Sequence, residues 1–311
     1  MRNEVGQFDS KQLMLSGAGI NLKPQHYDDA LALVGSGSSS GNAAGIWFEV
    51  HTENYFVSGG PRLHYLQAIA ENFPLSFHGV AGSLGSFTEQ PADITRRHLA
   101  QVSGLVKRFN PILVSEHATW SASQQAYFAD LLPLPRTQQA LNCLCDGIDR
   151  YQEAIGRPIL IENPTNYLDF ISEMDEADFL MEAVNRTGSG LILDVNNLYL
   201  SYRNTGVDPI QYLEALDPAK VGEIHIAGFD ADPNFPDELL IDSHAAPVSE
   251  AVWELLAKVI SMFGPRPVLL ERDDNIPTFN VLMDERNRAD GLLRSLSHTP
   301  TETPRQLAYA H

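Results

Sequence analysis

The chain has 311 residues, of which 43% are hydrophobic and 20% are charged, so it holds enough apolar material for a large globular core. Its 40 acidic residues against 21 Lys and Arg give a formal net charge of −19. This charge disfavours nucleic-acid binding, which needs a basic surface for phosphate contacts. The absence of a long apolar run and of a signal-peptide pattern at the start predicts a cytoplasmic protein without a membrane partner.

Eight short, nearly continuous apolar runs alternate with helical patterns along the chain. The predicted strands cover 17–22, 45–50, 74–78, 111–116, 158–162, 190–195, 221–228 and 267–271, and clear helical patterns lie at 62–73, 93–109, 137–155 and 250–263. Strands that are apolar throughout and followed by helices are typical of a parallel sheet covered by helices. Eight such units favour a (β/α)8 TIM barrel over an open doubly wound sheet, since no G-x-G-x-x-G follows the first strand.

The barrel is expected to form one domain over residues 16–296. Residues 1–15 lack periodicity and predict a flexible N-terminus, whereas the polar, proline-containing segment 297–311 predicts a disordered tail. Cys143 and Cys145 lie two apart in a predicted helix and point to different sides. We therefore predict free thiols at these two positions.

Six consecutive predicted strands carry His, Glu or Asp at or near their ends. These residues are His78, Glu116 and His117, Glu162, Asp194, His225 and Glu271. The carboxyl ends of barrel strands form a single rim, so we expect these side chains to converge there. Each alone has an ordinary explanation, such as a helix cap for Asp194. Together they indicate a metal site, because buried charges need counter-charges and Arg272 is the one basic residue immediately beside them.

The number of candidate ligands predicts more than one ion. Mixed imidazole and carboxylate ligation suits zinc, iron or manganese. Six ligands are too many for a single ion that leaves room for substrate, and Glu162 is suited to bridge two ions roughly 3.5–4 Å apart. Asp242 and His244 lie too far before Ser249, the predicted N-cap of the helix at 250–263, to cap that helix. They are candidates for a third position, together with the amide oxygen of Asn197.

Several stretches also resemble a known family. They are WFEVHTENYF, FHGVAGSLGS, SEHATWS, IENPTNY, LILDVNNLYLS, EIHIAGF, DSHAAPV and LLERDDNIP. Over residues 15–290 the chain resembles the xylose isomerase-like TIM barrels and, among them, the MbnB-like multinuclear non-haem iron-dependent oxidative enzymes. Members of this family use two to three mixed-valence iron ions and dioxygen to oxidise cysteines of ribosomally made peptides. Many of them also need a small partner protein that delivers the leader part of the peptide.

The resemblance implies a role for each candidate residue. It implies a first iron held by His78, His117 and Glu162, a second by Glu162, Asp194, His225 and Glu271, and a third by Asn197, Asp242 and His244. The choice of His117 over its neighbour Glu116 depends on the resemblance. His51, Glu53, Asn54, Arg272 and Asp273 complete the candidate catalytic set. For the first three of these residues, a hydrogen-bonded loop after the second strand is an equally good interpretation.

Three other functions remain open at this point. A zinc or manganese phosphodiesterase, similar to the endonucleases on the same barrel, is disfavoured by the acidity and by Asn197, where those endonucleases have a histidine. A sugar isomerase is disfavoured because no lysine ends a predicted strand. A metal-storage or scaffold barrel leaves the open coordination positions of the metal site unexplained.

Overall fold

A computed structural model describes residues 15–36, 44–87, 93–122, 127–170 and 172–297 of the protein. The segments 1–14 and 298–311, for which the sequence predicts mobility, lie outside these described residues.

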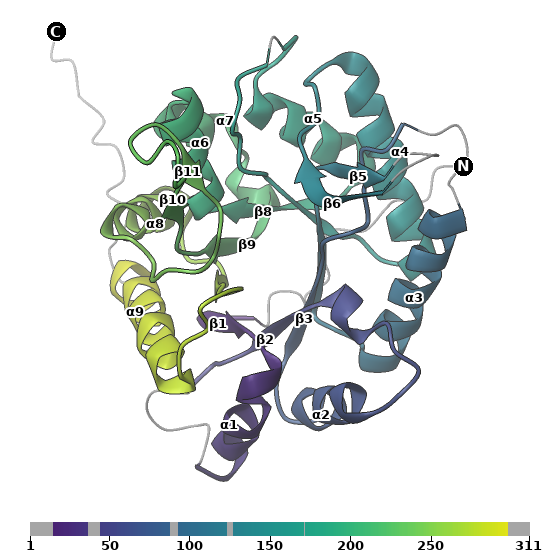
Figure 1. Ribbon diagram of the computed structural model, residues 1–311, viewed down its shortest axis with the longest axis vertical. Coiled ribbons are helices and arrows are strands. Elements are labelled where there is room, and N and C mark those ends of the chain that lie inside the picture. The colour runs from purple at the N-terminus through teal and green to yellow at the C-terminus, as the bar shows by residue number, and fades with distance from the viewer. Residues whose placement is uncertain (1–14, 37–43, 88–92, 123–126, 171, 298–311) are drawn as a thin grey trace, which may run out of the picture.

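Eight parallel strands close into a barrel in the order β1-β12-β9-β8-β7-β4-β3-β2, which confirms the predicted TIM barrel (Figure 1). The order follows the chain around the barrel once the four strands of two small hairpins are set aside. The barrel strands are β1 (Ala18–Asn21), β2 (Phe48–His51), β3 (Leu75–Gly79), β4 (Leu113–His117), β7 (Leu160–Glu162), β8 (Gly190–Asp194), β9 (Val221–Ile226) and β12 (Val268–Leu270).

Each barrel strand is followed by at least one helix, and the helices surround the barrel. They are α1 (Tyr27–Ala32), α2 (Pro61–Ala70), α3 (Asp93–Phe109), α4 (Gln138–Ile155), α5 (Glu176–Thr187), α6 (Val195–Thr205), α7 (Pro209–Ala215), α8 (Glu250–Phe263) and α9 (Phe279–Ser297). The antiparallel pairs β5 (Trp120–Ala122) with β6 (Tyr127–Leu132) and β10 (Asp230–Ala231) with β11 (Leu240–Ile241) extend the loops after β4 and β9. None of the helices in the described ranges is both long and apolar enough to cross a membrane.

The strand boundaries differ from the prediction by a few residues. β2 begins at Phe48 rather than at Gly45, whose φ of +69° belongs to a turn, and it continues to His51 because that residue still pairs with His78 of β3. β9 ends at Ile226, two residues before the predicted end at Gly228. The segment at Ala246 crosses Gly228 there, so close that its carbonyl leaves no room for a side chain. Ser249 caps α8 by accepting a hydrogen bond from Val252 N, as predicted.

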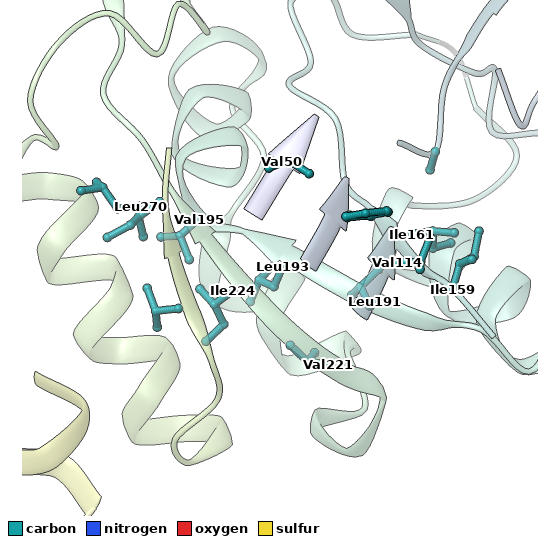
Figure 2. Packing of buried hydrophobic residues seen from close by; sticks show 14 of the residues in the cluster. Val50, Val114, Ile159, Ile161, Leu191, Leu193, Val195, Val221, Ile224 and Leu270 are labelled. Carbon is teal, nitrogen blue, oxygen red and sulfur yellow. The ribbon is translucent and has the colours of Figure 1, made fainter. Parts of the chain in front are cut away.

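The outward faces of the strands pack against the helices and form the main hydrophobic core. Figure 2 shows Val50, Val114, Ile161, Leu193 and Ile224 among these buried residues. Successive side chains of a strand point to opposite faces. The residues directly before and after these apolar positions therefore point into the barrel.

The inward faces are layered along the barrel axis. An apolar layer of Leu15, Trp47, Leu113, Leu160, Ile192 and Leu269 closes one end. Two residues after each of the last five of these, the inward position is polar. These polar residues are Glu49, Ser115, Glu162, Asp194 and Glu271. This change from apolar to ionisable side chains places the polar residues at the carboxyl ends of the strands, where barrel enzymes hold their active sites.

Candidate metal centre

The six residues predicted from the strand ends lie together inside the barrel. His78, His117, Glu162, Asp194, His225 and Glu271 are all buried, and their side-chain donor atoms form two overlapping groups. One group contains His78, His117 and Glu162, and the other contains Glu162, Asp194, His225 and Glu271. Within each group the donor atoms lie no more than 4.8 Å apart. These are the two sets that the resemblance implied as the first and second iron sites.

Glu162 lies where the two groups meet. Its Oε2 is 3.3 Å from His78 Nε2, 3.7 Å from His117 Nε2 and 3.7 Å from His225 Nδ1. One carboxylate oxygen thus faces imidazole nitrogens from three different strands. This arrangement suits a carboxylate that bridges two metal ions.

Two of the rings have a hydrogen-bond partner at Nδ1, on the side away from Glu162. His78 Nδ1 lies 2.8 Å from Ser115 Oγ, and His117 Nδ1 lies 3.1 Å from the carbonyl oxygen of Gly79. If His117 donates its Nδ1–H to that carbonyl, a bound ion would take the lone pair of Nε2. Burial lowers the pKa of His117, but the carboxylates of Glu162 and Glu116 raise it to about 9, so this ring loses a proton when an ion binds. Burial, reinforced by the neighbouring His117, also holds the pKa of His78 well below its usual range. The neutral imidazole that a metal requires is therefore favoured at His78.

Asp194 serves both of the functions considered for it. It is the N-cap of α6, because its Oδ1 accepts a hydrogen bond of 2.6 Å from Asn197 N. The side chain of Asn163 holds the Asp194 backbone on both sides, through Asp194 N and Asp194 O. Within the described residues, Asp194 Oδ2 has no hydrogen-bond partner. One carboxylate oxygen thus fixes the helix and the other is left for a cation.

The residues present fit a metal ion. Glu162 Oε2, Asp194 Oδ2 and His225 Nδ1 are buried and have no hydrogen-bond partner in the described part of the chain. Burial raises the pKa of Glu162 and of Asp194, and neighbouring carboxylates add to this shift. Burying unpaired carboxylates is unfavourable unless a cation compensates them. Divalent ions ligated by imidazole and carboxylate groups supply that compensation.

The predicted third position is assembled differently from the other two. His244 Nε2 lies 2.8 Å from Asp242 Oδ1, and His244 Nδ1 lies 2.9 Å from Asp273 Oδ2. The backbone at His244 has a φ of +49°, so a left-handed turn brings the two side chains together. Asn197 does not contact them: its Oδ1 accepts a hydrogen bond from Thr165 Oγ1. The amide that contacts Asp242 is that of Asn196, at 2.8 Å.

Of the remaining candidates, His51, Asn54 and Asp273 line a cavity of about 350 Å³ beside the metal ligands. Lys23, directly after the predicted strand at 17–22 and two residues after β1, also lines it and lies 2.5 Å from Asp273 Oδ1. Two expectations are therefore corrected. Arg272 is not the one basic residue beside the candidate ligands, and a lysine does follow the end of a predicted strand. Arg272 instead points to α9, where it pairs with Glu285 at 2.9 Å.

Glu53 does not line this cavity. Its Oε1 accepts hydrogen bonds from Val80 N and Ala81 N, and the neighbouring Glu116 accepts one from Gly82 N. Burial, reinforced by Glu116, raises the pKa of Glu53 to about 7. The two glutamates hold the loop after β3, so the hydrogen-bonded loop is the interpretation that applies to Glu53.

Two buried acids were missed by the sequence analysis. Glu49 of β2 and Glu223 of β9 form a third group with His225, and both are 0% exposed. The signal was present, since each lies two residues before a histidine of the same strand and so faces the same side. Both residues lie inside strands and before the strand ends, so the rule that active-site residues end the barrel strands does not find them.

Comparison with known proteins shows the family of the chain. Residues 17–294 match the family described as RiPP precursor modification enzyme MbnB/TglH/ChrH. The UPF0276 protein of Caulobacter vibrioides is 48% identical over 283 residues, covering 91% of this chain and 96% of that protein. The UPF0276 protein of Rhizobium meliloti is 44% identical over 278 residues, covering 89% of this chain and 86% of that protein.

Solved structures show the same fold at low identity. D-psicose 3-epimerase from Clostridium cellulolyticum H10 superposes with a TM-score of 0.59 at 9% identity, covering 91% of this chain and all of that one. A xylose isomerase-like TIM barrel protein from Mycobacterium smegmatis, solved in complex with magnesium, superposes with a TM-score of 0.56 at 11% identity, covering 92% and 99%. These likenesses confirm the fold, a xylose isomerase-like TIM barrel. The match over residues 17–294 establishes that the chain belongs to the MbnB/TglH/ChrH family of enzymes that modify precursors of ribosomally synthesised peptides.

Proposed function

We propose that this protein is a multinuclear iron-dependent oxidase that uses dioxygen to modify cysteine residues of a ribosomally synthesised peptide. The observation that carries the proposal is the pair of donor groups that share Glu162, since it offers ligands for two adjacent ions. If iron were bound there, it would supply redox chemistry for the oxidation of the cysteine sulfur, with dioxygen as the electron acceptor. The family match supports a peptide precursor as the substrate.

The chain's own residues would hold the peptide beside the ions. The cavity of about 350 Å³ adjoins the centre through Asp273, which contacts His244, and His244 Nδ1 lies 3.5 Å from Glu271 Oε2. Its volume suits a few residues of an extended peptide and not a folded protein. Lys23 and Arg62 line this cavity and offer positive charge to a substrate in an otherwise acidic protein.

Purification without oxygen tests the proposal directly. We expect roughly two to three iron atoms per chain, with oxygen uptake that depends on a cysteine-containing peptide and a matching mass change in that peptide. Mössbauer spectroscopy of the ⁵⁷Fe-loaded protein should show a mixture of oxidation states. The same peptide with serine in place of cysteine is the control. Tightly bound zinc together with phosphodiesterase activity would instead support the hydrolase alternative.

Asp242→Ala tests whether a third ion is separable from the other two. We expect this variant to lose at most one ion per chain, since Asp242 pairs with His244 and Asn196 and belongs to neither of the two groups that share Glu162. Inductively coupled plasma mass spectrometry of the purified variant measures the change. Asp237→Ala, an exposed aspartate nearby in the chain, should keep full metal content. Loss of all metal in Asp242→Ala would contradict a separable third position.

A further inference from the structure

Two glutamates lie in the barrel interior next to the metal centre without an assigned task. Glu49 and Glu223 are both 0% exposed. Glu49 accepts a hydrogen bond of 2.8 Å from Ser76 Oγ, but in the described part of the protein neither carboxylate oxygen of Glu223 has a hydrogen-bond partner. A buried carboxylate without a partner is strongly unfavourable. Glu223 must therefore gain a partner in the working protein.

The imidazole of His225 is placed to be that partner. Its two nitrogens face different groups: Nδ1 lies 3.6 Å from Glu271 Oε2 and 3.7 Å from Glu162 Oε2. On the other side, Nε2 lies 3.5 Å from Glu223 Oε1 and 3.9 Å from Glu49 Oε1. One nitrogen thus faces the donor atoms of the second metal position, and the other faces the two glutamates.

We propose that Glu223 is a positioning residue for the second metal position. Its carboxylate accepts the Nε2–H of His225 and so fixes the tautomer that directs the lone pair of Nδ1 to the ion held with Glu162 and Glu271. Histidines that bind metals commonly donate their other N–H to a carboxylate, which orients the ring and makes it a stronger ligand. The inference rests on the proposed function only in requiring a metal ion at this position, whichever metal it is.

Comparison with Glu116 separates this role from a merely structural one. Glu116 is as deeply buried, but it accepts hydrogen bonds from Gly82 N and His117 N and so stabilises the loop that it contacts. No backbone group donates to Glu223 within the described residues. Burying a charge without a hydrogen-bond partner is unfavourable, so an apolar side chain of similar size at this position should not lower the stability of the metal-free protein. A positioning role therefore predicts that metal affinity and metal-free stability respond in opposite ways.

Cobalt(II) binding to the demetallated protein tests the proposal, because cobalt reports its ligands by visible absorption and needs neither peptide nor dioxygen. We expect Glu223→Leu to weaken the ion held by His225 by roughly 10–100-fold while the ion held by His78 and His117 is kept. Glu223→Gln keeps an acceptor oxygen and should recover most of that affinity. The unfolding temperature of metal-free Glu223→Leu should equal or exceed that of the wild type.

Other outcomes would overturn the proposal. If Glu223→Leu lowers the metal-free unfolding temperature and loses both ions together, Glu223 is structural. If the leucine variant binds both ions as tightly as Glu153→Leu, an exposed control on α4, Glu223 does not position His225. In a further outcome, the wild type binds cobalt at both positions while the iron-loaded protein oxidises no cysteine-containing peptide. That result would refute the proposed function and leave this inference intact. A wild type that binds no cobalt would refute both.

Discussion

Glu162→Gln is expected to remove the metal ions of both positions and to lower activity by more than about 100-fold, beyond the usual effect of losing a partner outside the ligand sphere. The reason is that Glu162 belongs to both donor groups. Its Oε2 faces His78, His117 and His225, and an amide cannot supply the negative charge of a carboxylate to two ions. The measurement is metal content per chain together with turnover of the cysteine-containing peptide.

The fold should survive this substitution. Glutamine has nearly the same shape, and it removes a carboxylate whose pKa is raised by burial, so the metal-free variant should unfold at a temperature no lower than that of the metal-free wild type. Glu153→Gln, at an exposed position of α4, is the matched control and should keep metal and activity. Full metal content in Glu162→Gln would show that Glu162 is not a shared ligand.

Gly82→Ala is expected to destabilise the protein by about 3 kcal/mol and to weaken metal binding at the first position. An added methyl group would overlap the carboxylate of Glu116, which accepts a hydrogen bond from the backbone of Gly82 itself. Moving that carboxylate also breaks its hydrogen bond to His117 N. The estimate combines overpacking of a filled site with the loss of hydrogen bonds to a charged acceptor. Chemical denaturation of the metal-free protein measures the stability change.

Gly104→Ala on α3 is the control with the opposite expected sign. A methyl group at Gly104 would meet nothing within 4 Å, and alanine favours a helix over glycine by up to about 1 kcal/mol. If Gly82→Ala left both stability and cobalt affinity at wild-type values, the contact between Glu116 and the loop after β3 would not support His117.

The sequence predicted the barrel because the apolar runs were continuous. Outward-facing residues such as Val114 and Ile161 pack under helices, and their inward neighbours are also apolar at one end of the barrel. The local sequence pattern was therefore enough to predict the strands without information on tertiary contacts. The predicted strand boundary was wrong where a tertiary contact ends the strand, as at Gly228, which the Ala246 segment crosses.

The ligands on strands were predictable for a related reason. His78, Glu162, Asp194 and His225 lie on barrel strands, and the rule that strand ends share a rim places them together. Choosing between the neighbours Glu116 and His117 required knowledge of which residues of β4 point into the barrel. In the structure, every second residue (Leu113, Ser115 and His117) points inward, whereas Glu116 faces the loop after β3.

By itself the sequence determined the fold and the ionisable residues of the rim, since both depend on periodicity within single strands. Only the tertiary structure decided the residues that follow the strands. Lys23 reaches Asp273, Arg272 turns away to Glu285, and Asn196 replaces Asn197 beside Asp242. The physical reason is that a side chain beyond the last paired residue of a strand has no fixed direction. Its direction depends on loop turns, such as the left-handed φ of His244, and on partners from distant parts of the chain.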